Sequence, residues 1–290
     1  MDFASLAPLA GGWSGETFLA EAGGQRQVVR IHARQPRRAE VDAALLSLVR
    51  GLLPVPQVLD VRRPTDDLPA LLITSFLPGA RGDLLLPQLD VDGLRRIGSH
   101  VGDLVAVLGG MPLPCAGAFV DGDLSVEPWD QPDGLPGLVA HAELPRWTAE
   151  ERTRLLEVAT VAQDLLDTVD RTCLVHSDLN PKNLLVDPDT LAITGLVDWE
   201  YAHAGHPFTD LGNVLRFDRH PAYVQGVLAA YELRRGTAPA DALALARAAD
   251  LWALVDLAGR VGQNPVATSA DALLREIARQ RDVGAALAFC

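Results

Sequence analysis

Hydrophobic and polar residues alternate in short runs along the first 77 positions, which is typical of β-strands. Between these runs, residues 36–50 place apolar side chains at helical spacing, and Gly51 follows where a helix C-cap is expected. Gly23 and Gly24 predict a tight turn between two strands. The predicted strands cover residues 17–22, 27–32 and 70–74. The pattern indicates a small strand-rich lobe with one helix.

From residue 78 onward the apolar residues recur mainly every three or four positions, which predicts helices. The predicted helices cover residues 91–108, 148–169, 209–217, 221–235, 240–261 and 269–287. A loop rich in Pro and Gly is expected at 109–145. Short strands are expected at 172–175, 184–186 and 192–197. We therefore expect an α+β protein with a strand-rich N-lobe, residues 1–77, and a larger, mainly helical C-lobe, residues 78–290.

A polar loop lies between two of these short strands and reads His176-Ser177-Asp178-Leu179-Asn180-Pro181-Lys182-Asn183. Its H-x-D-x-x-x-x-N spacing is that of a phosphotransferase catalytic loop. Asp178 would accept or orient the proton of an attacking hydroxyl. Asn183, and Asp198 after the next strand, would supply oxygen ligands to Mg²⁺ beside a triphosphate. Alternatively, these are ordinary turn and strand-end residues that cap local backbone groups.

The same loop belongs to a longer pattern, with the segments Gly195-Leu196-Val197-Asp198-Trp199-Glu200 and Gly205-His206-Pro207-Phe208-Thr209-Asp210-Leu211. Together they resemble the aminoglycoside phosphotransferase/choline kinase family, which shares the protein-kinase-like fold. The resemblance covers nearly the whole chain and is most specific in its C-terminal half. It implies that Asp178 is the catalytic base, that Asn183 and Asp198 hold Mg²⁺, and that Asp210 supports the catalytic loop.

The resemblance also implies that ATP is the phosphoryl donor and that backbone groups of Ser75 and Leu77 hold its adenine. The chain departs from the family pattern at Ser177, where the family usually has Gly, and at His206, where it more often has Asp. Protein kinases carry Arg at the first of these positions, so a side chain there is compatible with activity.

Candidate phosphate-binding residues lie in the N-lobe. Backbone N–H groups of Gly11, Gly12 and Ser14 could approach a phosphate closely, although a plain hairpin turn is an equal alternative. Arg30 occupies the strand position that kinases give to lysine, and a guanidinium binds phosphate bidentately. Glu40 on the following helix is its expected ion-pair partner. An exposed strand arginine and a helix-surface glutamate are the alternatives.

Lys182 is the only lysine in the chain and lies inside the catalytic loop, where its ammonium could neutralise charge on the transferred phosphoryl group. Glu200 would face the acceptor. Trp252 and Asp256, four positions apart on a predicted helix, could hold a cationic amine through cation–π and charge contacts. The alternatives are a solvated lysine, a solvated carboxylate and a tryptophan packed in the core.

The chain is acidic, with a formal net charge of -13 over 290 residues. This charge disfavours nucleic acid and anionic lipid surfaces, and it favours a cationic small molecule. No run approaches the ~20 apolar residues of a membrane span, and the start lacks a secretory signal. The three cysteines form no paired pattern, so a cytoplasmic location without disulfides or zinc is expected.

The sequence therefore predicts an ATP- and Mg²⁺-dependent phosphotransferase acting on a hydroxyl of a small molecule. An aminoglycoside-like antibiotic, with a role in resistance, fits the acidic charge and the family resemblance. The alternatives are a kinase of a neutral antibiotic or of an amino-alcohol metabolite, or a nucleotide-binding regulatory protein without turnover. The pattern leaves the oligomeric state and the choice between ATP and GTP open.

Overall fold

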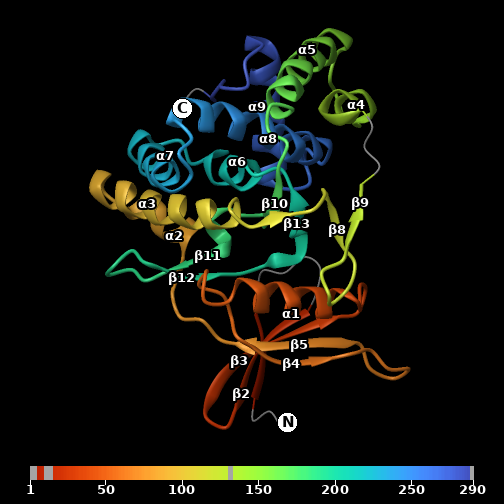
Figure 1. The fold of residues 1–290 in the computed structure, drawn as a ribbon, viewed down its shortest axis with the longest axis vertical. Helices are drawn as coiled ribbons and strands as arrows, with labels where there is room; N and C mark the ends of the chain where they lie inside the picture. The colour runs from red at the N-terminus through yellow and green to blue at the C-terminus, as the bar shows by residue number, and fades with distance from the viewer. Residues whose placement is uncertain (1–4, 10–15, 130–132, 288–290) are drawn as a thin grey trace.

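A computed structural model describes residues 5–9, 16–129 and 133–287. It contains the two expected parts, a strand-rich N-lobe and a helical C-lobe, so the predicted fold class is confirmed (Figure 1). The division between residues 77 and 78 stays a prediction. The glycine-rich candidates Gly11, Gly12 and Ser14 lie outside the described residues.

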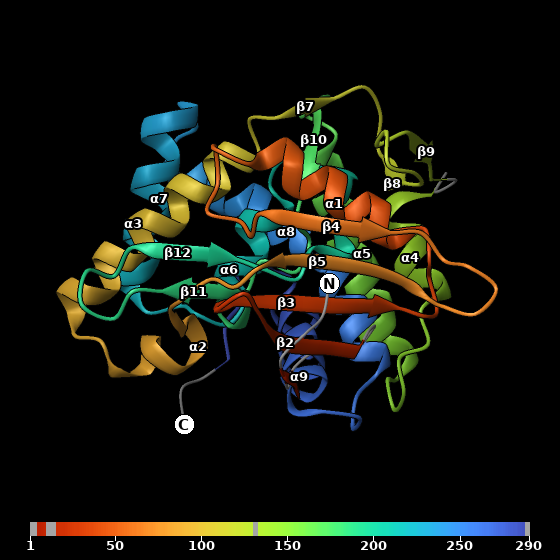
Figure 2. The same ribbon diagram turned by 90° about the horizontal axis from the view of Figure 1, so that it is seen from below.

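The N-lobe is built on a five-stranded antiparallel sheet in the order β1-β2-β3-β5-β4. Its strands are β1 (Ser5–Pro8), β2 (Glu16–Ala22), β3 (Gln25–His32), β4 (Val58–Arg62) and β5 (Ala70–Ser75). Figure 2 looks onto this sheet. The predicted hairpin is β2–β3, and its turn residues Gly23 and Gly24 have φ of 59° and 77°, which glycine adopts without strain.

Helix α1 (Arg38–Val49) lies between this sheet and the C-lobe (Figure 1). It packs on β4 and β5 on one side and contacts the 3₁₀ turn Trp199–Tyr201 of the C-lobe on the other. The predicted helix begins two residues too early because Pro36 and Arg37 form a turn before it. Helix α1 thus contacts the segment that follows Asp198.

The C-lobe is mainly helical, and each predicted helix is present, two of them with the predicted bounds and the others with shifted ends. The helices are α2 (Gly82–Leu85), α3 (Val91–Leu108), α4 (Gly134–His141), α5 (Ala149–Leu166), α6 (Thr209–Leu215), α7 (Pro221–Arg235), α8 (Pro239–Gly259) and α9 (Pro265–Gln280). A 3₁₀ helix covers Leu86–Gln88. Among the described residues, no helix has the length and apolar character that a bilayer crossing requires.

Two small sheets carry the polar loop of the C-lobe. One has the order β12-β11-β6, from β12 (Ile193–Leu196), β11 (Leu184–Val186) and β6 (Ala80–Arg81). The other has the order β7-β10-β13-β8-β9, from β7 (Pro112–Leu113), β10 (Thr172–Val175), β13 (His203–Gly205), β8 (Gly117–Phe119) and β9 (Val126–Pro128). The prediction of a plain loop at 109–145 was therefore incomplete. It contributes three of these strands and α4, which are too short for the periodicity to reveal.

Helices α3 and α7 pack at very short range through glycines. A Cβ added at Gly98 of α3 would lie 2.5 Å from the carbonyl oxygen of Tyr223 in α7. Gly102 faces the carbonyl of Val227, and Gly226 of α7 faces the carbonyl of Arg95, with equally little space. The small residues let the two backbones touch and leave no room for a methyl group.

We expect Gly98→Ala to lower the free energy of unfolding by about 1–3 kcal/mol, because the added methyl overpacks the α3–α7 contact. At an uncrowded helix position the same change raises stability by up to ~1 kcal/mol through helix propensity. Urea denaturation of the variant and the parent protein measures the sign. A stabilised variant would contradict the close backbone contact.

Candidate active site

A buried carboxylate holds the backbone of the polar loop between β10 and β11. Asp210, in the first turn of α6, accepts the backbone N–H of His176 at 2.8 Å through Oδ2 and that of Ser177 at 2.8 Å through Oδ1. Burial raises the pKa of Asp210 to about 7, and the two N–H donors oppose that shift. This is the supporting contact that the family resemblance implies for Asp210. Ser177 itself has φ 68°, in the left-handed region that is normally costly for a side chain.

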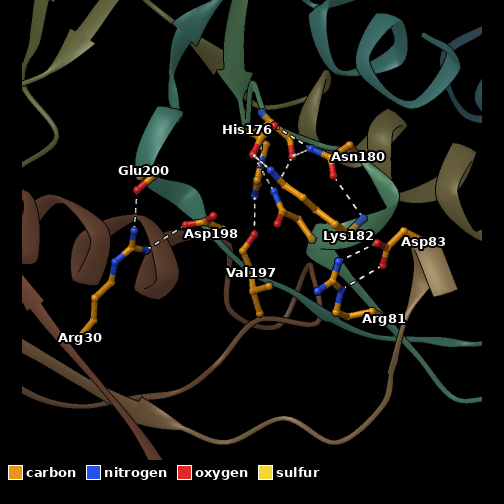
Figure 3. A network of polar contacts seen from close by, with 11 residues as sticks. Arg30, Arg81, Asp83, His176, Asn180, Lys182, Val197, Asp198 and Glu200 are labelled. Atoms are coloured by element: carbon orange, nitrogen blue, oxygen red, sulfur yellow. Dashed lines mark hydrogen bonds and ion pairs between the residues drawn. The ribbon is translucent and has the colours of Figure 1, made fainter. Parts of the chain in front are cut away.

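The imidazole of His176 fixes the loop to the neighbouring strand. The ring is fully buried; its Nδ1 accepts the backbone N–H of Asp178 at 3.3 Å, and its Nε2 lies 3.1 Å from the carbonyl of Val197 (Figure 3). With Nδ1 as an acceptor, Nε2 donates to that carbonyl, which defines a neutral ring. Burial lowers the pKa of His176 to about 4, against the pull of the Asp178 charge. His176 therefore joins the two segments that carry Asp178 and Asp198.

Three side chains of the loop surround the carboxylate of Asp178. The amide nitrogen of Asn180 donates to Oδ1 at 2.6 Å, and that of Asn183 donates to Oδ2 at 2.9 Å. The ammonium of Lys182 lies 3.3 Å from Oδ2. The Asp178 side chain stays 22% exposed, so its carboxylate is oriented by the loop and still reachable from solvent.

Asn180 is not predicted as a site residue, although its position before Pro181 signals the start of a 3₁₀ turn. Its side-chain oxygen accepts the N–H of Lys182 at 3.1 Å, which caps the turn Pro181–Asn183. Arg81 and Asp83, also not anticipated, form an ion pair of 2.6 Å on the segment that packs against this turn (Figure 3). Both are partly exposed.

Arg30 reaches from β3 to the segment after β12 (Figure 3). Its Nη1 lies 3.1 Å from Oδ1 of Asp198, and its Nη2 lies 2.6 Å from Oε2 of Glu200. Burial and the neighbouring Asp198 charge raise the pKa of Glu200, while Arg30 opposes the shift. Asp198 is held in the left-handed region, at φ 67° and ψ 61°. One guanidinium thus bridges two carboxylates of the C-lobe.

The expected Arg30–Glu40 ion pair was wrong. Glu40 pairs with Arg63, which is largely exposed, so Glu40 lies at the surface. The carboxylate of α1 that turns inward is Asp42, two positions later, which is 3% exposed. Residues two positions apart in a helix differ by about 200° around its axis, so Glu40 and Asp42 point to opposite sides of α1.

Arg38 and Asp42 form a largely buried pair that the sequence pattern does not predict. Nε of Arg38 donates to Oδ1 of Asp42 at 2.6 Å, and Nη2 donates to the backbone carbonyl of Trp199. Nε2 of His32 lies 3.8 Å from Oδ2 of Asp42. Burial raises the pKa of Asp42, and the charges of Arg38 and Arg30 oppose this. The pair links α1 to the residue that follows Asp198.

Only some of the backbone groups proposed to bind adenine at the lobe connection are free of other hydrogen bonds. The N–H of Ser75 donates to the carbonyl of Gln57 at 2.8 Å, and its hydroxyl accepts the N–H of Gln57 at 2.9 Å. The backbone contribution of Ser75 to a base is therefore limited to its carbonyl. Leu77 lies against Gly195 of β12. Their role in nucleotide binding stays a prediction.

Trp252 and Asp256 of α8 do not form a joint amine site in this structure. Trp252 is partly buried and packs against the core, and Asp256 pairs with Arg260 on the surface. Tyr201 is about half exposed, and partial burial and the charges of Glu200, Asp178 and Asp198 raise the pKa of its hydroxyl, while Arg260 opposes this.

The oxygen atoms present fit a hard cation shared with phosphate. Because Nδ2 of Asn183 donates to the carboxylate and to the backbone carbonyl of Asp178, its Oδ1 points away from Asp178. That oxygen and the carboxylate of Asp198 are the donor types that Mg²⁺ prefers. The described residues contain no cluster of three or more His, Cys, Asp or Glu that would hold a metal alone. Such a sparse donor set suits Mg²⁺, which usually keeps phosphate and water ligands.

Comparison with known proteins gives a consistent result. A model of the family described as "Phosphotransferase enzyme family" matches residues 5–243. An aminoglycoside 3'-phosphotransferase from Streptomyces ribosidificus is 29% identical over 155 residues, which are 52% of this chain and 54% of that protein. The match thus spans about half the length of that relative. Acyl-CoA dehydrogenase family member 11 of Mus musculus is 34% identical over 55 residues, 19% of this chain and 7% of that protein.

Solved structures share the fold over almost the whole chain. A GDP complex of an aminoglycoside 2'-phosphotransferase has a TM-score of 0.71 at 18% identity, covering 98% of this chain and 94% of that one. A thermostable mutant of aminoglycoside phosphotransferase APH(4)-Ia with ADP and hygromycin B has a TM-score of 0.69 at 19% identity, with coverages of 98% and 96%. A microcompartment-associated aminopropanol kinase has a TM-score of 0.62 at 22% identity, with coverages of 95% and 91%.

The buried imidazole of His176 makes a testable contribution to acid sensitivity. An unfolded chain takes up this proton near pH 6.5, whereas the folded ring resists it until about pH 4. The stability that His176 contributes is complete above pH 6.5 and is lost as the pH falls toward 4.

We therefore expect His176→Asn to flatten the pH dependence of the free energy of unfolding by about 1.4 kcal/mol per pH unit in this window. Chemical denaturation at pH 6.5, 5.5 and 4.5 measures the slopes. Parallel slopes for the parent protein and the variant would contradict a neutral, buried ring.

Proposed function

This chain belongs to the phosphotransferase enzyme family, and on that premise we propose that it transfers the γ-phosphoryl group of ATP to a hydroxyl of a small molecule. The observation that carries the proposal is the carboxylate of Asp178, oriented by Asn180 and Asn183 and still 22% exposed. A general base must be both fixed and reachable by its substrate. A regulatory protein without turnover would have no need of such an arrangement.

In the proposed reaction, the acceptor oxygen forms a bond to the γ-phosphorus while the bond to the β–γ bridging oxygen breaks. ADP leaves, and the proton of the acceptor hydroxyl passes to the carboxylate of Asp178. Asn180 and Asn183 hold that carboxylate in place, so it meets the hydroxyl in one orientation. Asp210 acts indirectly, because it holds the backbone from which Asp178 projects.

Asn183 and Asp198 are the proposed residues for Mg²⁺. When bound there, Mg²⁺ would neutralise the charge of the phosphate groups. Arg30 is the proposed phosphate contact of the N-lobe, since its guanidinium already lies against Asp198. Glu200, proposed from the sequence as an acceptor contact, is more simply the carboxylate that orients Arg30. This is the role that the sequence reasoning gave to Glu40.

We infer that the acceptor carries a protonated amine beside its hydroxyl. The carboxylate of Asp178 is accessible, two further carboxylates, Asp198 and Glu200, lie together on Arg30, and the chain carries a net charge of -13. Aminoglycosides and amino alcohols share this amine-and-hydroxyl chemistry, and relatives of both kinds are named among the similar proteins. An aminoglycoside is the first candidate because the matched curated relative acts on that class by name. An amino alcohol is the second candidate.

The proposal is tested by incubating the protein with Mg²⁺, ATP or GTP, and a panel of aminoglycosides, macrolides, peptide antibiotics and amino alcohols. We expect ADP release and a product heavier by one phosphoryl group for an amine-containing acceptor. Asp178→Asn should lower turnover by at least ~100-fold, in the range of a lost general base. Asp189→Asn, at an exposed turn after β11, is the matched control. Full turnover by Asp178→Asn would refute the proposed role.

Lys182 gives a separate prediction. Its ammonium lies beside Asp178 on the edge of the site, where it could also meet the transferred phosphoryl group. Lys182→Ala should therefore lower kcat at saturating ATP by ~10- to 1000-fold, with a smaller change in the KM for ATP. Steady-state kinetics with the identified acceptor measures both constants. A change in kcat of about twofold or less would leave Lys182 as a solvated loop residue.

A further inference from the structure

Two arginines of the N-lobe hold three consecutive residues of the C-lobe. Arg30 of β3 bonds the carboxylates of Asp198 and Glu200, at 3.1 and 2.6 Å. Arg38 of α1 donates to the backbone carbonyl of Trp199, the residue between them. Each residue of this turn, which we name the Asp198 turn (residues 198–200), is therefore held from the other lobe.

The two arginines differ in whether a bound ligand can displace their contacts. Arg30 contacts carboxylates, and a phosphate or a metal ion that binds those carboxylates competes for the same charge. Arg38 contacts a neutral carbonyl, whose bond neither Mg²⁺ nor phosphate would displace. The contact of Arg38 is therefore compatible with a loaded site, whereas the contacts of Arg30 are exchangeable.

Arg38 is itself fixed by a buried partner. Asp42, one helical turn further along α1, accepts its Nε at 2.6 Å, and the Asp42 side chain is 4% exposed. Arg38 is the first residue of α1, where the helix dipole disfavours a positive charge. The adjacent carboxylate offsets that cost and points the guanidinium out of the helix toward the C-lobe. Charge and geometry thus direct Arg38 at the Asp198 turn.

The Asp198 turn needs such support because of its backbone. Asp198 has φ 67° and ψ 61°, a conformation that costs a non-glycine residue ~1–2 kcal/mol. On the C-lobe side, the ring of Trp199 is buried at 4.8 Å from the ring of His176. On the N-lobe side, Arg38 holds the carbonyl of the same residue. Trp199 is thereby fixed at both its ring and its backbone.

From these contacts we propose that Arg38, held by Asp42, is a positioning residue that keeps the carboxylate of Asp198 in place for the Mg²⁺–nucleotide complex. The inference rests on the proposed function of the Asp198 site. It makes the contact between the lobes a condition for metal binding, because the residue that fixes the C-lobe ligand comes from α1 of the N-lobe. Arg38 touches neither substrate nor metal in this role.

The test is a magnesium titration of nucleotide binding, read by calorimetry with ADP rather than by turnover. We expect Arg38→Met to raise the Mg²⁺ concentration for half-saturation by at least ~10-fold, as the loss of an outer-shell partner of a metal ligand does. Binding of ADP without Mg²⁺ should change less than about twofold, since Arg38 contacts a carbonyl and not the nucleotide. Arg37→Met removes the same charge from the exposed neighbouring position and should behave like the parent protein.

A conservative variant separates positioning from folding. Arg38→Lys keeps the charge, but one ammonium replaces the forked guanidinium that spans Asp42 and the Trp199 carbonyl, so we expect a Mg²⁺ requirement between those of the parent protein and Arg38→Met. If Arg38→Met does not fold, a parent-like requirement in Arg38→Lys overturns the proposal.

The remaining outcomes distinguish the inference from the function on which it rests. One outcome is that Mg²⁺ strengthens ADP binding by the parent protein and that Arg38→Met has the same Mg²⁺ requirement. This result would overturn the positioning role and leave the kinase proposal standing. Equal loss of ADP binding with and without Mg²⁺ would mark Arg38 as structural and also overturn the inference. A parent protein whose nucleotide binding ignores Mg²⁺ would overturn the proposed function itself.

Discussion

The buried carboxylate of Asp210 is the contact on which the rest of the site depends. It accepts two successive N–H groups, those of His176 and Ser177, at the point where the chain leaves β10. Burying a carboxylate is costly, and the two short hydrogen bonds offset that cost only when the loop has this shape. The left-handed backbone at Ser177 follows from the same constraint, since it turns both N–H groups toward one acceptor. The contact of Asp210 with the loop backbone thus helps to fix the orientation of Asp178 in the absence of substrate.

Positive charge in the site is supplied mainly by arginine, and Arg30 and Arg38 each bind more than one partner. Arg30 spans two carboxylates, and Arg38 spans a carboxylate and a carbonyl. A guanidinium can do this because its donors diverge in a rigid plane, whereas an ammonium is a point charge. The acidic groups of the C-lobe are therefore joined to the N-lobe by a few planar contacts. In this arrangement Arg30 and Asp198, the proposed phosphate and metal residues, also join the two lobes.

Local patterns in the sequence predicted the parts of the site that lie close together in the chain. The strands around residues 176–183, the positions of Asp178 and Asn183, and the helices α3 and α7 follow from short-range spacing, and the structure has them. The partner of Arg30 could not be read in this way, because Asp198 and Glu200 lie 168 and 170 positions further along. Arg38 and Asp42 have the spacing of an ordinary surface pair. Only the packing of α1 against the C-lobe reveals that they are buried.

Lys182 has a consequence beyond its place beside Asp178. Because these 290 residues contain no other lysine, an amine-directed reagent has one side-chain target among them, and that target lies within the loop at residues 176–183. Its side chain is 46% exposed, so such a reagent can reach it. An aldehyde or activated ester built on a nucleotide would react selectively with this amine, because the nucleotide would bind nearby and no other lysine side chain competes. The composition of the chain thus provides a selective covalent handle at the proposed site of phosphoryl transfer.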